Sequence, residues 1–270
     1  MIERSLYIFP LSVCLLVPLA YFLSFIVAVK LDHSKFEFPF LSRSSTDSPE
    51  SCIYSQIINF ASFVLFITIY IRYRQLCQLI RNNPTCGKKY SQTNFIFFIC
   101  GIITAFSMSI ISNFPHANVF PVRLLATYLT FTASVGALYC EMLLSSWIRP
   151  LLYSHRTLPI IRTILTIICT LALVTFCFFF NCNIFLNWLM NVIRYFFVFQ
   201  TITVVKYDNE KKLWTPTSPG WKYHLGTIIS AWILTISLLI YVLTLIFDFR
   251  RIKVISPKIF LTDDIIDDHD

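Results

Sequence analysis

Charged residues are scarce in this chain, and several long segments contain none. Only 13% of the 270 residues are charged, whereas 56% are hydrophobic and 27 are phenylalanine. The segment from Ile8 to Val29 carries no charge over its whole length. A soluble helix of that length would have a polar stripe, so its absence excludes an ordinary soluble helical protein. About 20 apolar helical residues cross a bilayer core of about 30 Å, and these blocks supply them.

The apolar blocks predict an all-α, polytopic membrane bundle with six transmembrane helices in one domain, residues 1–249. The expected spans lie near residues 7–29, 52–72, 94–112, 123–147, 161–181 and 224–247. The first block is too long for the core of a signal peptide, so we expect it to be retained. Residues 250–270 end in a run of aspartates and are expected to form a disordered cytosolic tail.

One further apolar stretch, residues 183–205, does not fit the six-span scheme. It is interrupted by Asn187, Asn191, Arg194 and Gln200. An arginine at the centre of a span costs roughly 2.5–3.5 kcal/mol on insertion scales. We therefore expect an interfacial or extension helix that does not span. The alternatives are a real additional span, an insertion, and an error in the gene model.

The distribution of lysine and arginine sets the expected orientation, because cytosolic loops are enriched in these residues. Thirteen of the 22 basic residues fall on one side of the six-span scheme: Arg4, Arg72, Arg74, Arg81, Lys88, Lys89, Arg149, Arg156, Arg162, Arg250, Arg251, Lys253 and Lys258. That side is predicted to be the cytosol. Both termini are then cytosolic, which requires an even number of spans.

The sequence also lacks the motifs of common enzyme centres. It has no Gly-rich phosphate loop, His-Glu-x-x-His pair, Cys-x-x-Cys pair or Gly-x-Ser-x-Gly elbow. The 5 histidines are scattered, and most of the 9 cysteines lie in predicted spans. We therefore predict no enzyme activity, no cofactor and no metal. The net charge of +8 does not indicate a nucleic-acid partner, because the charges lie next to the membrane.

Glu141 is the one acid well inside an apolar block. Ionisable groups inside membranes are functional candidates, because the loss of water must be offset by a partner. Glu141 lies about two helical turns from the end of its block, where Arg149 follows. Its side chain is therefore expected to reach the interface or to pair there, in a structural role. The alternative is a functional site.

Basic residues next to the spans are candidates for contacts with anionic phospholipid headgroups. They are Arg74, Arg81, Lys88, Lys89, Arg250, Arg251 and Lys253. Each charge of this kind adds about 1 kcal/mol near an anionic leaflet. The alternative is that these residues only set the topology. The bilayer is the expected partner, together with a protein partner that the sequence does not identify.

The segment after the first span carries a more specific pattern. Ser48-Pro49-Glu50-Ser51 leads into Ile57-Ile58-Asn59-Phe60, and that span closes with Tyr70-Ile71-Arg72-Tyr73. Ile111-Ser112-Asn113-Phe114, Leu213-Trp214-Thr215-Pro216, His224 and Phe247-Asp248-Phe249 follow in order. This pattern resembles the DRAM (damage-regulated autophagy modulator) family and its Frag and Sfk relatives, six-span membrane proteins. Arg123 departs from it, since the family has a His-containing, Gly-rich entry to this helix.

The resemblance implies a non-catalytic regulatory protein of the endolysosomal membrane that influences autophagy. A neighbouring branch of the family implies an alternative, a plasma-membrane scaffold that supports recruitment of phosphatidylinositol 4-kinase. A transporter or channel is the second alternative, and a lipid-remodelling enzyme is disfavoured because no nucleophile–base pair is visible.

The resemblance assigns a structural or regulatory role to the residues that carry its motifs. They are Pro49, Glu50, Asn59, Phe60, Tyr70, Arg72, Tyr73, Asn113, Phe114, Trp214, Pro216, His224 and Asp248. Among them, Asn59 can bond across to another helix, which is worth about 0.6–2 kcal/mol in a membrane. Arg72 and Arg74 are expected to anchor the cytosolic end of the second span.

Overall fold

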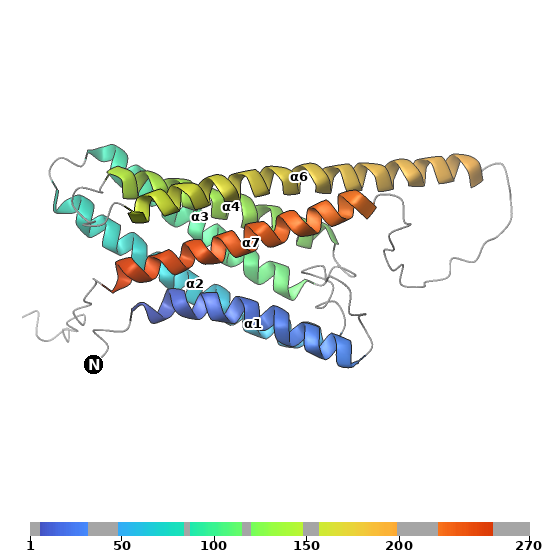
Figure 1. Cartoon of the computed structure of the whole chain (residues 1–270), viewed down its shortest axis with the longest axis horizontal. Coiled ribbons are helices and arrows are strands. Elements are labelled where there is room, and N and C mark those ends of the chain that lie inside the picture. The colour runs from blue at the N-terminus through green and yellow to red at the C-terminus, as the bar shows by residue number, and fades with distance from the viewer. Residues whose placement is uncertain are drawn as a thin grey trace, which may run out of the picture.

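The computed structural model of this chain describes residues 6–31, 48–83, 87–114, 120–147, 157–198 and 221–250. Within these ranges every regular element is an α-helix, so the predicted all-α class is confirmed. The helices are α1 (Ile8–Lys30), α2 (Glu50–Arg81), α3 (Lys88–Asn113), α4 (Phe120–Trp147), α6 (Thr157–Val198) and α7 (Trp221–Phe249). Consecutive helices run in opposite directions along the long axis of the molecule (Figure 1).

Most helices are longer than the predicted spans, so several basic residues counted with the cytosolic charges lie on helices. α2 continues to Arg81, so Arg74 and Arg81 lie on the helix and not in a loop. α6 begins at Thr157, so Arg162 lies in its second turn. All three arginines were counted with the cytosolic charges, because basic residues gather at the boundary with water; Arg162 nevertheless falls at the start of the expected span 161–181.

The long apolar stretch after the fifth predicted span continues the same helix. α6 runs without interruption for 42 residues, from Thr157 to Val198. At 1.5 Å per residue this is about 63 Å, roughly twice the thickness of a bilayer core. Figure 1 shows its far end extending well past the other helices. Up to Val198, the segment 183–205 therefore continues α6 as a helix, as the expected extension helix would; residues 199–205 lie outside the described residues.

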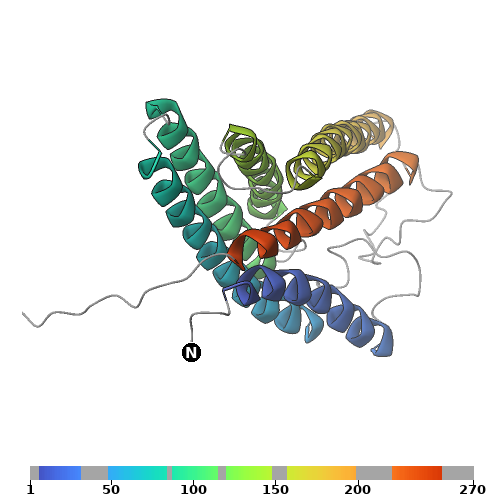
Figure 2. The same cartoon turned by 60° about the vertical axis from the view of Figure 1, so that its left-hand side comes forward.

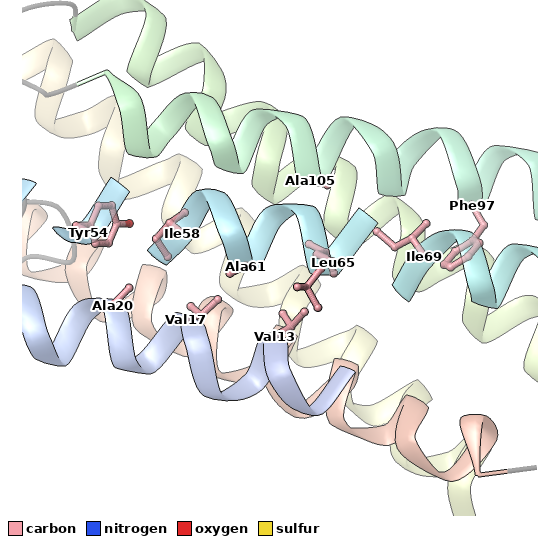
Figure 3. Close-up of a cluster of buried hydrophobic side chains, with 11 residues drawn as sticks. Val13, Val17, Ala20, Tyr54, Ile58, Ala61, Leu65, Ile69, Phe97 and Ala105 are labelled. Carbon is pink, nitrogen blue, oxygen red and sulfur yellow. The ribbon is translucent and has the colours of Figure 1, made fainter. Parts of the chain in front are cut away.

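The six helices form a closed ring of neighbours. Each packs against the next along the chain, and α7 also packs against α1; Figure 2 shows α7 between α1 and α6. In the largest buried cluster, Val13, Val17 and Ala20 of α1 face Tyr54, Ile58, Ala61 and Leu65 of α2 (Figure 3). Both sets recur at intervals of three and four residues, the spacing of a single helix face. Small side chains at the crossing let the backbones approach closely.

The two ends of the described chain lie at the same end of the bundle. Leu6 packs against Leu245 and Phe249, which are near the end of α7. The guanidinium group of Arg250 lies 5.6 Å from the ring centroid of Tyr7. An even number of helices between these residues gives this arrangement, as the six-span scheme expects.

The distribution of side chains is that of a membrane protein. Phe22, Phe106 and Leu125 are more than 60% exposed on the outer surface, whereas charged and hydroxyl side chains are buried between the helices. Among the described residues, α1, α2, α3, α6 and α7 contain stretches long and apolar enough to cross a bilayer. α4 has the length of a span, with 28 residues, and turns hydroxyl and charged groups into the bundle. The protein is therefore an integral membrane protein.

Candidate functional site

Four charged side chains from four different helices meet inside the bundle. Arg72 comes from α2, Glu141 from α4, Arg162 from α6 and Asp248 from α7. None is more than 2% exposed. We refer to these four residues as the ionic cluster. Because they lie far apart in the sequence, the cluster exists only when all four helices are packed.

Each arginine of the ionic cluster contacts both acids. Arg72 donates from Nε to Oε1 of Glu141 at 3.0 Å, and its Nη2 contacts Oε1 of Glu141 and lies 3.2 Å from Oδ2 of Asp248. Arg162 contacts Oε1 of Glu141 from Nη1 at 3.2 Å and Oδ2 of Asp248 from Nη2. Two positive and two negative charges balance, so the cluster has no net charge when all four groups are ionised.

Neutral side chains complete the hydrogen bonding of both guanidinium groups. Arg72 donates to Oε1 of Gln75 at 2.7 Å. Arg162 donates to Oγ of Ser145 at 3.0 Å, to Oγ1 of Thr244 at 3.1 Å and to the carbonyl oxygen of Thr244 at 3.3 Å. The arginine positions are thus fixed by groups on two helices besides their own, α4 and α7, and by Gln75 on α2.

The structure corrects the expected surroundings of Glu141. Its carboxylate is buried inside the bundle; Arg149 lies outside the described residues. Its Oε1 accepts hydrogen bonds from Arg72, Arg162 and Ser145. Removing one partner of a buried ion pair costs about 3–5 kcal/mol, because the remaining charge is left uncompensated. The cluster therefore couples the packing of four helices to the charge of each member.

A second polar group joins α2 to α3 toward the opposite end of the bundle. Nδ2 of Asn59 donates to Oδ1 of Asn113 at 2.8 Å, and Nδ2 of Asn113 donates back to Oδ1 of Asn59 at 3.1 Å. Oγ of Ser109 also donates to Oδ1 of Asn59 at 2.6 Å. The bond across to another helix that the sequence predicted for Asn59 is therefore present, and its partner is another motif residue.

Comparison with known proteins assigns the chain to a family. The family model described as the Frag1/DRAM/Sfk1/Cwh43P N-terminal domain matches residues 5–252. The chain belongs to the Frag1/DRAM/Sfk1 family. DNA damage-regulated autophagy modulator protein 2 of Homo sapiens is 26% identical over 93% of this chain and 86% of its own length.

Other family members with related names match as well. DNA damage-regulated autophagy modulator protein 1 of Homo sapiens is 26% identical over 89% of this chain and 90% of its own length. Modulator of macroautophagy TMEM150B-A of Xenopus laevis is 26% identical over 54% of this chain and 60% of its own length. No solved structure matches this chain.

The structure brings some of the Frag1/DRAM/Sfk1 motif residues together and leaves others apart. Arg72 and Asp248 meet in the ionic cluster, and Asn59 meets Asn113. Glu50 is buried at the start of α2, whereas Pro49, Phe60, Tyr70 and Phe114 are exposed. Tyr73 stacks on Phe98 of α3 with ring centroids 4.5 Å apart. Trp214, Pro216 and the side chain of His224 lie outside the described residues.

The expected lipid-headgroup residues lie at the end of the bundle where α2 ends and α3 begins. Arg74, Arg81, Lys88, Lys89 and Arg250 are exposed there, and Arg251 and Lys253 are outside the described residues. Nζ of Lys89 lies 4.8 Å from the ring centroid of Trp147. Arg72 is different, because it is buried and neutralised within the bundle. The expectation that it anchors the cytosolic end is therefore corrected.

Sequence reasoning missed Arg162, and it missed the partners of Glu141. A usable signal was present, since Arg72, Glu141, Arg162 and Asp248 lie in four different apolar segments, near the end assigned to the cytosol. Two of these charges are acidic and two are basic. Acidic and basic residues at the same predicted depth in the membrane can pair between helices. Looking for such pairs would have indicated the ionic cluster.

Proposed function

We propose that this protein is a non-catalytic regulatory protein of endolysosomal membranes that modulates autophagy. The observation that carries the proposal is the match to relatives named as autophagy modulators over most of both chains. Family membership over residues 5–252 supports the same conclusion.

The geometry of the ionic cluster favours regulation over catalysis. Glu141 and Asp248 each contact two guanidinium groups. A charge network between four helices is suited to a protein that changes its packing in response to a signal, because loss of one charge affects every contact.

Rescue of autophagic flux tests the proposal. In cells that lack the endogenous protein, flux is measured from the turnover of a lipidated autophagosome marker with and without a lysosomal inhibitor. The wild-type chain should restore flux, and Asp248→Asn should not, since it leaves two buried arginines with one acid. Arg74→Gln, at an exposed arginine of the same end, is the matched control and should restore flux.

Two outcomes would overturn the proposal. The first is that loss of the protein leaves flux unchanged. The second is that the tagged chain colocalises with plasma-membrane markers and not with lysosomal markers, which would favour the lipid-kinase scaffold.

A further inference from the structure

The ring of helices surrounds a partly open cavity of about 270 Å³. Residues of all six helices line it, and most of these side chains are apolar, among them Val17, Ile58, Phe97 and Leu238. Along α4 the lining runs from Arg123 to Glu141, 18 residues apart. This separation corresponds to about 27 Å of helix. The cavity is therefore long, narrow and apolar along its walls.

The end of the cavity near the start of α4 carries a buried positive charge. Arg123 lines the cavity and is only 5% exposed. Its Nη1 donates to the carbonyl oxygen of Phe114 at 3.0 Å. In the part of the chain that the structure describes, no carboxylate forms a salt bridge with it. A guanidinium group held inside a membrane bundle is stabilised by an anion, and here the adjacent volume is a cavity.

The polarity of the two ends differs. Near Arg123 the cavity is also lined by Tyr21 and Tyr54, whose hydroxyl groups form a hydrogen bond of 3.2 Å. At the far end, Glu141 belongs to the ionic cluster, which is neutral as a whole. One end therefore attracts an anion, the walls favour hydrocarbon, and the other end adds no net charge.

We propose that the cavity binds a single-chain lipid with an anionic headgroup, with the headgroup at Arg123 and the hydrocarbon chain extending toward Glu141. The cavity volume of about 270 Å³ favours one chain over two, because it lies just below the roughly 300–1,000 Å³ range of ligand pockets. Carboxylate and phosphate headgroups share the chemistry that a guanidinium group recognises.

Competition on the wild-type protein tests this without any mutation. The full chain is reconstituted in phosphatidylcholine vesicles and labelled with a palmitate analogue that carries a photoreactive group and an alkyne. Palmitate and lysophosphatidate serve as anionic competitors, and methyl palmitate is the neutral control of equal chain length. At least one anionic lipid should compete about 10- to 100-fold better than methyl palmitate, as expected for one charge-assisted hydrogen bond. Whichever of palmitate and lysophosphatidate competes more strongly identifies the preferred headgroup, carboxylate or phosphate.

Variants separate the headgroup contact from the chain contact. Arg123→Gln should reduce labelling about 10- to 100-fold, and Arg123→Lys should retain most of it because the charge is kept. Ala137→Leu, which fills the cavity wall on α4, should reduce labelling while leaving Arg123 in place. Arg74→Gln removes an exposed arginine outside the cavity and should not change labelling.

Two results would overturn the proposal: equal competition by methyl palmitate, or unchanged labelling of both Arg123→Gln and Ala137→Leu. If a variant fails to fold, the competition on the wild-type chain still decides. Lipid binding is measured on purified protein, whereas the role in autophagy is measured in cells. Failure of the lipid-binding proposal is therefore distinguishable from failure of the proposed function.

Discussion

Glu141→Gln is the most direct perturbation of the ionic cluster. Glutamine has nearly the same shape and keeps an oxygen that can accept hydrogen bonds from Arg72, Arg162 and Ser145. It removes the negative charge, so Arg72 and Arg162 are left with Asp248 as the remaining acid of the cluster. The cluster then carries one uncompensated positive charge in a site that is nearly inaccessible to solvent.

The expected loss of stability follows from that charge. Breaking a buried ion pair costs about 3–5 kcal/mol. Because glutamine preserves part of the hydrogen bonding, we expect about 3 kcal/mol. For a chain of this size, 1 kcal/mol corresponds to about 2–4 °C in Tm, so the apparent Tm should fall by about 6–12 °C. Thermal unfolding followed by tryptophan fluorescence in a mild detergent measures this shift.

A second substitution tests whether charge balance is the cause. Arg72→Gln combined with Glu141→Gln returns the cluster to zero net charge. The double variant should therefore be more stable than the sum of the two single losses predicts, by about 0.5–3 kcal/mol. Arg74→Gln is the control for removing an arginine from the same helix end. A Tm for Glu141→Gln equal to that of the wild type, or strictly additive losses in the double variant, would refute the reasoning.

Three further predictions concern other parts of the bundle. Asn59→Ala removes the amide pair with Asn113 and should lower stability by about 0.6–2 kcal/mol in thermal unfolding, whereas Thr93→Ala, at a partly exposed site of α3, should not. Gly101→Ala places a Cβ 2.5 Å from Cγ2 of Ile69, so it should destabilise the α2–α3 contact by about 1–3 kcal/mol, and Ile69→Ala should suppress part of this loss. Phe106 faces outward and is 69% exposed. Phe106→Ser should therefore reduce the fraction of the protein recovered in membranes, because it places a polar side chain against the lipid.

The helices were predictable from the sequence because the bilayer imposes a length on apolar segments. Five of the six predicted spans lie inside a helix of the structure, and the first, 7–29, begins one residue before α1. The all-α class follows from the same constraint. The ends of the helices were less predictable. α2 continues through Arg74 to Arg81 because helix backbone satisfies its own hydrogen bonds in water as well as in lipid.

The candidate site depended on contacts that local sequence patterns do not encode. Arg72 and Glu141 are 69 positions apart, and Arg162 and Asp248 are 86 positions apart. Arg162 was counted with the cytosolic charges because a charge near the end of a span is usually solvated. Only the packing of α4, α6 and α7 shows that it is neutralised inside the bundle. By contrast, the role of Asn59 was predictable, because an amide group inside a span needs a partner on a neighbouring helix.

The sidedness of the bundle is the claim on which the other conclusions depend. One epitope is inserted in the connection after Asn82 and another is placed after Asp270, and both are probed with antibodies in cells whose plasma membrane alone has been permeabilised. With both termini and this connection in the cytosol, both epitopes should be stained. Staining of the Asn82 epitope without the Asp270 epitope would contradict the even number of spans and the shared cytosolic end of α2 and α7.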